Sequence, residues 1–334
     1  MINNLLFLFN YCSIIFYMNK NEQIKKLFSK KVLCLAPMAG YTDIGFRYLC
    51  KKYGADLVFT EMISAKAICH NSKRTFDMMQ ITEFEKPVVL QLFGHNPDDF
   101  KQALLNEHTF KFDFIDINMG CPAPKIFKNG DGSALLEDIN TAKSIIEAVV
   151  SSTDKPVSVK FRSGVTEDKI IAVEFAKMCE QAGVSFITIH PRTRSQGYAG
   201  ESDWEIVKKV VNAVNIPVVA SGDCLTYFDF KYLTENCGAS GVMIGRGAMG
   251  KPEIFWQIKN CTMDGVSNQE KKEQILTHIS ILSNHFNEKF VSATIKKHLA
   301  CYLKQLKVSS ATIVEAMKLD SVAEIVEFIQ NIKI

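Results

Sequence analysis

The sequence lacks the cysteine spacing that small metal and redox sites require. Its 334 residues include ten cysteines, but no two of them form a CxxC pair. This excludes a zinc ribbon, the usual iron–sulfur spacings and a thioredoxin-type motif. Scattered thiols are typical of small buried side chains in a reducing compartment, so a cytoplasmic protein without a bound metal is expected. Only Cys121, at the start of a loop rich in Gly and Pro, departs from this pattern.

An excess of one charge is also missing. The net charge is +3, with 47% hydrophobic and 22% charged residues. A balance so even does not by itself indicate nucleic-acid binding. The composition is that of an ordinary globular chain, long enough to bury a large core.

The apolar stretch at residues 5–18 is too short to cross a membrane, which takes about 20 residues. It has neither the basic start nor the small-residue cleavage site of a signal peptide. Because Met18 is followed by polar residues, like a natural start, residues 1–31 are predicted to be an N-terminal extension, partly disordered. A membrane-associating tail is the alternative, although no stable membrane association is expected.

From residue 32 onward, short β-branched and apolar runs alternate with segments of helical spacing. The eight predicted strands are 32–39, 57–62, 88–94, 114–120, 157–163, 186–192, 218–223 and 241–247. This alternation predicts an α/β fold with a parallel sheet, and the nearly continuous apolar strands predict that both faces are covered. Eight units favour a (β/α)8 TIM barrel. An open doubly wound sheet is the alternative, but no GxGxxG follows the first strand.

The strand–helix rhythm stops after about residue 255. Helical patterns then cover residues 269–287, 292–306 and 321–332. The sequence therefore predicts a barrel domain at 32–258, a linker near 261–267 and a small all-helical C-terminal domain at 268–334.

Polar residues stand at the C-terminal ends of nearly all eight strands, where barrels of this kind carry their chemistry. These ends hold Pro37, Met38, Glu61, Gln91, Asn118, Cys121, Lys160, Arg162, His190, Arg192, Asp223, Gly245 and Arg246. Burying an unpaired cation such as Lys160 would cost several kcal/mol, so convergence on a ligand explains the pattern better than isolated core groups.

The residue types indicate which ligand. The Gly-rich turns at 221–223 and 245–247 leave backbone N–H groups free for a phosphate, and Arg246 adds a charged fork. Gln91 offers an amide that can pair with an imide edge, and Lys160 offers a fixed cation. A flat ring with an imide and a phosphate tail fits this set, so flavin mononucleotide (FMN) is the predicted cofactor.

Several of these segments together resemble the tRNA-dihydrouridine synthases, and the bacterial B-type subgroup in particular. The resemblance extends from about residue 32 to 306 and rests on LAPMAGYTD (35–43), GADLVFTEM (54–62), VVLQLFG (88–94), DINMGCP (116–122), SVKFRSG (158–164), TIHPRTRSQGYAG (188–200), SGD (221–223) and VMIGRGAMG (242–250). The chain differs from the family pattern at Pro191, Ser221 and Lys251.

The resemblance implies a role for each matching residue. Cys121 is implied as the general acid that protonates C5 of uracil while reduced flavin delivers hydride to C6. A thiol suits this role because its ordinary pKa of about 8.5 keeps it protonated at neutral pH. Asn118 is implied to hold the extruded base, and Lys125 and Arg162 to meet tRNA phosphates. The implied flavin contacts are Pro37, Met38, Gln91, Lys160, His190, Ser221, Asp223, Gly245 and Arg246.

The helical tail carries a basic stretch. No acidic residue occurs between Glu288 and Glu315. In a helix, five lysines would fall within about a quarter turn, and these are Lys289, Lys296, Lys297, Lys304 and Lys307. A solvated lysine face is the ordinary interpretation of such a stretch. The resemblance favours binding of tRNA phosphates, with Lys296, Lys297 and Lys304 as substrate-binding residues.

The predicted function is therefore FMN-dependent reduction of a D-loop uridine in tRNA by a monomeric enzyme, with NADPH or NADH as electron donor. A flavin barrel oxidoreductase acting on a free pyrimidine is one alternative, and a non-catalytic tRNA-binding protein is another. The Gly-rich loop at 129–136 is expected to be mobile and to close over the substrate.

Overall fold

The structure is a computed structural model that describes residues 20–333. The apolar stretch at residues 5–18, and the part of the predicted N-terminal extension that precedes residue 20, therefore lie outside the described residues. All strands belong to one parallel sheet. They are β1 (Val32–Leu35), β2 (Leu57–Phe59), β3 (Ile63–Ser64), β4 (Val88–Phe93), β5 (Phe114–Met119), β6 (Val157–Arg162), β7 (Phe186–His190), β8 (Val218–Ser221) and β9 (Gly241–Ile244).

The sheet closes on itself. Its order is β2-β1-β9-β8-β7-β6-β5-β4-β3, and β2 also pairs with β4. Both β2 and β3 pair with β4, with Phe59 opposite Val89 and Ile63 opposite Leu92. They therefore occupy one strand position, interrupted by a bulge. The barrel has eight strand positions, which confirms the predicted (β/α)8 fold and rules out the open sheet.

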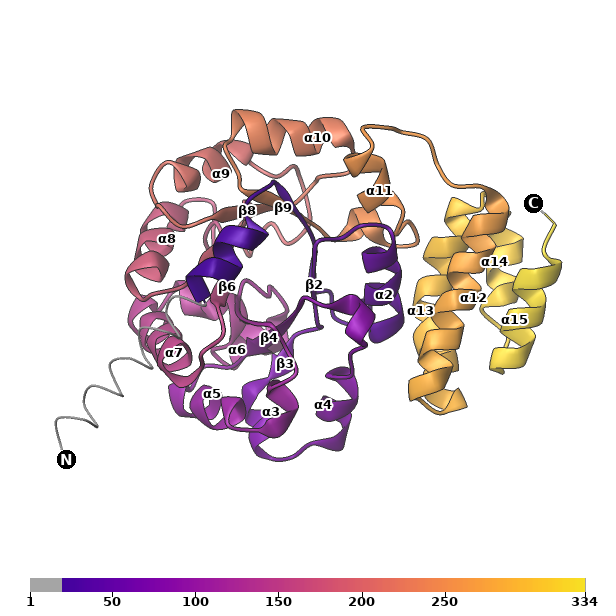
Figure 1. Ribbon diagram of the computed structural model, residues 1–334, viewed down its shortest axis with the longest axis horizontal. Helices are drawn as coiled ribbons and strands as arrows, with labels where there is room; N and C mark the ends of the chain where they lie inside the picture. The colour runs from indigo at the N-terminus through magenta and orange to yellow at the C-terminus, as the bar shows by residue number, and fades with distance from the viewer. Residues whose placement is uncertain (1–19, 334) are drawn as a thin grey trace.

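Helices cover the outside of the barrel (Figure 1). They are α2 (Ile44–Lys52), α3 (Ala65–Cys69), α4 (Lys73–Met78), α5 (Pro97–Leu104), α7 (Ile139–Ser152), α8 (Ala172–Gln181), α9 (Trp204–Val211), α10 (Tyr227–Lys231) and α11 (Ile254–Lys259). The short helix α6 (Pro124–Lys128), none of whose residues is buried, lies in the connection between β5 and α7. A further helical segment at residues 20–27 lies across the barrel. Ile24, Leu27 and Phe28 of this region pack on the barrel interior, with the rings of Phe28 and Phe186 5.4 Å apart.

The barrel interior changes character along its axis. Near the N-terminal strand ends the inward side chains are apolar, including Phe59, Phe114 and Phe186. Alternate residues of a strand share a face, so the residues two and four positions further along β4 to β7 also point inward. Toward the C-terminal ends of these strands, those inward residues are polar. These polar positions are Gln91, Asp116, Asn118, Ser158, Lys160, Thr188 and His190. The apolar level supports a polar level at the mouth.

The C-terminal helices form a bundle beside α2 and α11 (Figure 1). They are α12 (Asn268–His285), α13 (Glu288–Gln305), α14 (Ser310–Ala316) and α15 (Val322–Asn331). The short helix α14 was not predicted. Ile44 and Leu49 of α2 belong to the same buried apolar cluster as Ile295 and Leu299 of α13. The bundle is thus completed by one face of a barrel helix. Among the described residues, no helix is both long and apolar enough to span a membrane.

A buried polar cluster joins the bundle to the barrel. Oδ1 of Asp43 accepts hydrogen bonds from the N–H groups of Gly45 and Phe46, which caps α2. The same carboxylate contacts Nε2 of His278 and Nε2 of His298, each at 2.9 Å. Burial alone would raise the pKa of Asp43, but the two histidines hold it well below its usual range. Within residues 20–333 this is the one close group of three side chains of metal-ligand type, and its 2.9 Å separations are hydrogen-bond distances.

Candidate active site

A cavity of about 370 Å³ opens at the C-terminal strand ends. Eight of the residues predicted to bind the cofactor line it, and they are Pro37, Met38, Lys160, His190, Ser221, Asp223, Gly245 and Arg246. They come from β1, β6, β7, β8, β9 and the turns that follow them. The structure therefore brings together side chains that lie more than 200 positions apart in the sequence.

Lys160 is the partly buried cation of this cavity. Its ammonium group makes no hydrogen bond or ion pair with any residue in the described part of the chain, although it lines the cavity. Burial, followed by the nearby Arg162, lowers its pKa to about 8. A cation left without a partner at such a position is costly unless a ligand supplies an acceptor. The cavity is thus built for an electron-rich or anionic group.

His190 is buried at the same level. Burial lowers its pKa well below the usual range, and neighbouring cations add to the effect. The imidazole is therefore neutral at physiological pH, with one ring N–H to donate and one ring nitrogen to accept.

The opposite end of the cavity is held by an ion-pair network. Arg192 is buried, and its guanidinium contacts both carboxylate oxygens of Asp223, at 2.6 and 3.0 Å. Arg246 is half exposed and contacts the same carboxylate at 3.3 Å. Its guanidinium also lies 4.9 Å from the ring centroid of Tyr198. Asp223 thus fixes the turn after β8, while Arg246 keeps donors free for a ligand.

Glycine is required in this turn. Gly222 has a φ of +115°, and a Cβ atom there would lie 2.5 Å from Oγ of Ser202 and 2.9 Å from Cδ2 of His190. No side chain fits that space without moving its neighbours. The backbone can consequently approach closely, as the sequence pattern SGD predicted.

Cys121 lies beside this cavity at the end of β5. Its backbone N–H donates to Oδ1 of Asn118 at 2.9 Å, and its carbonyl accepts from N–H and Oγ of Ser133. Burial raises the pKa of the thiol, although Arg162 and Lys160 lie near enough to oppose the rise. The thiol therefore stays protonated at neutral pH and can act as an acid.

Gln91 lies deeper than predicted. It is 1% exposed and does not line the cavity. Its Nε2 donates to Oδ2 of Asp116 at 2.7 Å, and its Oε1 accepts from Nδ2 of Asn118 at 2.9 Å. Both ends of the amide are engaged within the protein, so direct contact with a flavin ring stays a prediction.

Arg162 and Lys125 differ sharply in exposure. Arg162 is 2% exposed and donates to the carbonyl oxygens of Gly120, Thr193 and Gly197. It ties together the loops after β5 and β7, and a contact with tRNA phosphate stays a prediction. Lys125 is exposed on α6. This helix directly follows residues 120–123, the turn that carries Cys121 and is called the Cys121 turn below.

The loop after α6 is packed in this structure, and its closure over the substrate stays a prediction. Residues Gly132–Leu136 form a 3₁₀ turn, and most of them are buried. A Cβ on Gly132 would lie 3.0 Å from Cβ of Cys121. Gly132 thus allows the loop to pack closely against Cys121. The glycine content of the loop had suggested flexibility instead.

The predicted lysine face is partly present. Lys297 and Lys304 are exposed on α13, while Lys296 is partly covered, with Nζ 3.3 Å from Oδ1 of Asp320. Lys307 lies beyond the end of α13 at a φ of +57°, so its assignment to the same helical face is wrong. The opposite face of α13 packs into the bundle and includes the buried residues Ile295, Leu299, Tyr302 and Leu303.

Sequence reasoning missed three contributors. The sequence placed Arg192 only at a strand end, and it placed Asp116 and Tyr198 only within the DINMGCP and TIHPRTRSQGYAG motifs, with no role for either. The acidic residue inside β5 was the available signal, since a buried carboxylate needs partners. The contacts of Tyr198 with Arg162 and Arg246 depend on how two loops fold and had no sequence signal.

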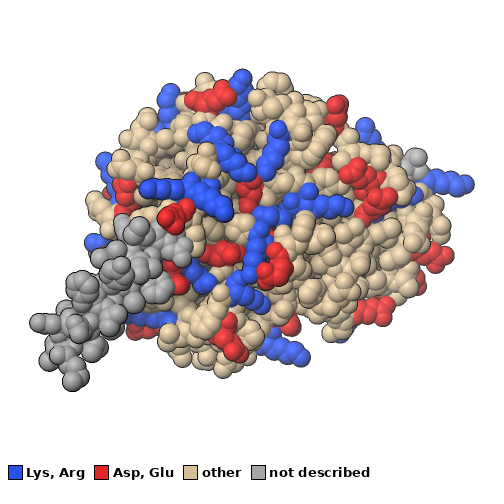
Figure 2. All heavy atoms as spheres, in the orientation of Figure 1, with Lys and Arg blue, Asp and Glu red and all other residues tan. Residues whose placement is uncertain are grey.

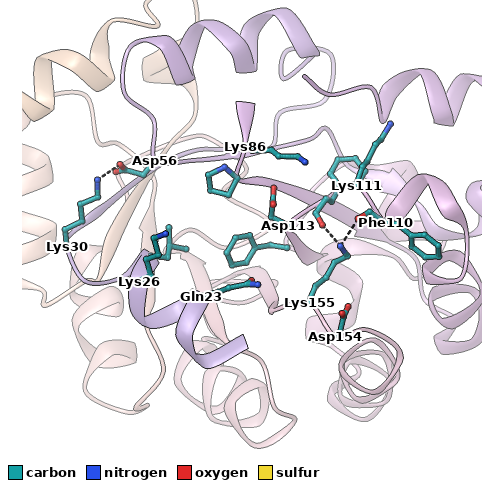
Figure 3. A pocket seen from close by; sticks show the side chains of 14 residues that line it. Gln23, Lys26, Lys30, Asp56, Lys86, Phe110, Lys111, Asp113, Asp154 and Lys155 are labelled. Atoms are coloured by element: carbon teal, nitrogen blue, oxygen red, sulfur yellow. Dashed lines mark hydrogen bonds and ion pairs between the residues drawn. The ribbon is translucent and has the colours of Figure 1, made fainter. Parts of the chain in front are cut away.

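A larger cavity, of about 700 Å³, lies at the other end of the barrel, under the segment at residues 20–30 (Figure 3). Basic side chains gather over this face of the barrel (Figure 2). Several of its lysines are already engaged, since Lys155 donates to the carbonyls of Phe110 and Phe112, and Lys30 pairs with Asp56. It lies away from the C-terminal strand ends, so the smaller cavity is the candidate active site.

A TIM barrel with cationic side chains in a cavity at its C-terminal strand ends, and a cysteine nearby, has the architecture of a barrel enzyme. The family follows from comparison: a model of the dihydrouridine synthase (Dus) family matches residues 34–333, and the chain belongs to that family. The prediction of the family is confirmed.

Similar proteins support this assignment. A probable tRNA-dihydrouridine synthase of Rickettsia bellii is 36% identical over 276 residues, covering 81% of this chain and 85% of that protein. The tRNA-dihydrouridine synthase B of Vibrio parahaemolyticus is 36% identical over 282 residues, covering 83% and 87%. The solved structure of histamine dehydrogenase from Rhizobium sp. 4-9 matches with a TM-score of 0.55 at 12% identity, over 75% of this chain and 48% of that one, which shows the fold alone.

Proposed function

We propose that this chain is a cytoplasmic, FMN-dependent tRNA-dihydrouridine synthase that reduces the C5–C6 double bond of a D-loop uridine, with NADPH as electron donor. The observation that carries the proposal is that a protonated Cys121 thiol and the Lys160 cation, whose ammonium makes no hydrogen bond or ion pair among the described residues, both lie at the C-terminal strand ends of one barrel. Membership of the dihydrouridine synthase family supplies the reaction to which this pairing belongs.

The residues present fit FMN. Pro37 and Met38 offer an apolar wall for a flat ring, and Lys160 offers a cation for its electron-rich edge. At the other end, Arg246 and the backbone near Gly245 offer donors for a phosphate. When bound, FMN in its reduced form supplies the hydride that C6 of the uracil ring accepts.

The protein's own part in the reaction is to deliver a proton and to hold the base. As hydride reaches C6, the thiol of Cys121 gives its proton to C5, so that one hydride and one proton saturate the double bond. The raised pKa of Cys121 keeps that proton in place at neutral pH. Asn118 is 8% exposed, and its Oδ1 accepts a hydrogen bond from the backbone N–H of Cys121 at 2.9 Å. It is proposed to hold the base.

Reaching a uridine inside folded tRNA requires its extrusion, at a cost of a few kcal/mol. The exposed Lys297 and Lys304 of α13 and Lys125 of α6 are proposed to bind backbone phosphates around the mouth. Lys297 approaches the barrel rim, since a Cβ on Gly40 would lie 3.8 Å from its Nζ. The helical bundle and the barrel would then grip the RNA together.

The test is mass spectrometry of nucleosides from unmodified transcript tRNA incubated with the purified protein and NADPH. A gain of two hydrogens on one D-loop uridine is the expected result. Cys121→Ala should keep bound yellow flavin and lose about 10²- to 10⁴-fold in turnover, the usual worth of a general acid. Cys69→Ala, a half-buried thiol outside the cavity, is the matched control. Reduction of free uracil with tRNA left unchanged would identify a small-molecule enzyme instead.

A further inference from the structure

A continuous hydrogen-bond chain runs from the barrel interior to the Cys121 turn. Asp116 is fully buried on β5 and accepts from Oγ of Ser158 at 2.5 Å and from Nε2 of Gln91 at 2.7 Å. Gln91 accepts from Nδ2 of Asn118 at 2.9 Å. Asn118 in turn accepts from the backbone N–H groups of Gly120, at 3.2 Å, and Cys121, at 2.9 Å.

The direction of every bond in this chain is fixed from both ends. The backbone N–H of Cys121 can only donate, so the oxygen of Asn118 must face it and the nitrogen of Asn118 must face Gln91. The oxygen of Gln91 must then face Asn118, and its nitrogen must face Asp116. Oδ2 of Asp116 accepts this last bond. Burial raises the pKa of Asp116 to about 7, and a proton carried on Oδ1, which faces the hydroxyl of Ser158, still leaves Oδ2 as an acceptor. The orientation of the Gln91 amide that the backbone N–H of Cys121 requires is therefore the same as the one that Asp116 requires.

An amide rotated by half a turn would break the agreement. If Gln91 rotated, its oxygen would face the carboxylate of Asp116 and its nitrogen would face the nitrogen of Asn118. Neither arrangement forms a hydrogen bond, and both groups are nearly excluded from water. Asp116 consequently fixes the orientation of the Gln91 amide, and Gln91 fixes that of Asn118, although within the described residues the side chain of Asp116 makes no hydrogen bond to the backbone at Cys121.

We propose that Asp116 is a positioning residue that sets the amide orientations of Gln91 and Asn118 and thereby holds the Cys121 turn in place. The inference rests on the proposed role of Cys121 for its catalytic meaning. The geometry of the thiol turn can nevertheless be measured whether or not the protein reduces tRNA.

What matters at position 116 is an acceptor facing Gln91. Oδ2 serves Gln91, whereas Oδ1 faces the hydroxyl of Ser158, which can either donate or accept. An asparagine could turn its nitrogen to Ser158 and keep its oxygen on Gln91. Asp116→Asn should therefore preserve the chain, whereas Asp116→Leu, similar in shape but without an acceptor, should break it.

The experiment measures the rate at which iodoacetamide alkylates Cys121 in the flavin-loaded protein, followed by peptide mass spectrometry. Without the acceptor at position 116, the Cys121 turn loses the equivalent of about one neutral hydrogen bond. Asp116→Leu should therefore raise the rate of Cys121 alkylation roughly three- to tenfold. Asp116→Asn should stay within about twofold of the parent, because its acceptor remains. Thr188→Val is the matched control, because Thr188 is buried in the same interior and its Oγ1 has no hydrogen-bond partner among the described residues.

Gln91→Met breaks the same chain one link further along and keeps the test decisive if Asp116→Leu does not fold. Gln91→Met should raise the rate of Cys121 alkylation by the same factor as Asp116→Leu. In tRNA turnover, Asp116→Leu should lower kcat and leave KM for tRNA unchanged, and Asp116→Asn should restore kcat. The proposal would be overturned if Cys121 alkylation were unchanged in whichever of Asp116→Leu and Gln91→Met folds. It would also be overturned if Cys121 were alkylated as quickly in Asp116→Asn as in Asp116→Leu.

Discussion

Replacing Gly45 by alanine tests how tightly the helical bundle is joined to the barrel. Gly45 lies in the first turn of α2, two residues after the capping residue Asp43. A Cβ atom there would lie 2.3 Å from Cδ2 of His278, 3.0 Å from its Nε2 and 3.1 Å from its carbonyl oxygen. The ring cannot move aside freely, since Asp43 and Tyr302 hold its two nitrogens.

The magnitude follows from three opposing effects. Alanine in place of glycine inside a helix normally stabilises by about 1 kcal/mol. Overpacking at a filled site costs about 1–3 kcal/mol. Displacing the His278 ring also breaks a hydrogen bond to a carboxylate, worth about 1.5–3 kcal/mol. The clash and the lost bond outweigh the helix propensity, so Gly45→Ala should lower the free energy of unfolding by roughly 2–5 kcal/mol.

Denaturant unfolding monitored by fluorescence measures this change. Gly265→Ala is the matched control, because it makes the same substitution in the linker, where a Cβ meets no atom within 4 Å. The control should be unchanged or more stable by up to about 1 kcal/mol. A Gly45→Ala protein as stable as the Gly265→Ala protein would refute the close contact between α2 and α12.

Two further predictions concern pH and RNA. Burial, followed by the nearby His278, lowers the pKa of His298 in the folded protein. Below about pH 6.5, His298 therefore binds a proton in the unfolded chain but not in the folded chain. The free energy of unfolding should consequently fall as the pH falls through this range. A denaturation midpoint that rises between pH 7.5 and 5.5 would contradict this, and His298→Asn should flatten the slope. Lys297→Glu should weaken tRNA binding and reduce its salt slope by about one, with FMN retained. Lys143→Glu on the outer helix α7 serves as control, and equal tRNA affinity in the two proteins would place the RNA surface elsewhere.

The sequence by itself determined the barrel and the composition of its mouth. Alternating apolar runs and helical patterns located all eight strand positions, because each strand needs burial on both faces whatever its neighbours are. The polar residues at the strand ends, from Glu61 to Arg246, were recognisable because a polar side chain in an apolar strand requires an explanation. The family followed from the same motifs.

Only the tertiary structure decided which partner each polar group takes. Gln91 was expected at the ligand, yet its amide is held between Asp116 and Asn118, because residues on adjacent strands meet only once the register of the barrel is set. The Gly-rich loop was expected to move, yet Gly132 packs against Cys121. The contact between Asp43 and the histidines of α12 and α13 joins residues more than 200 positions apart. Composition and periodicity describe each segment alone, whereas these contacts depend on how segments pack against one another.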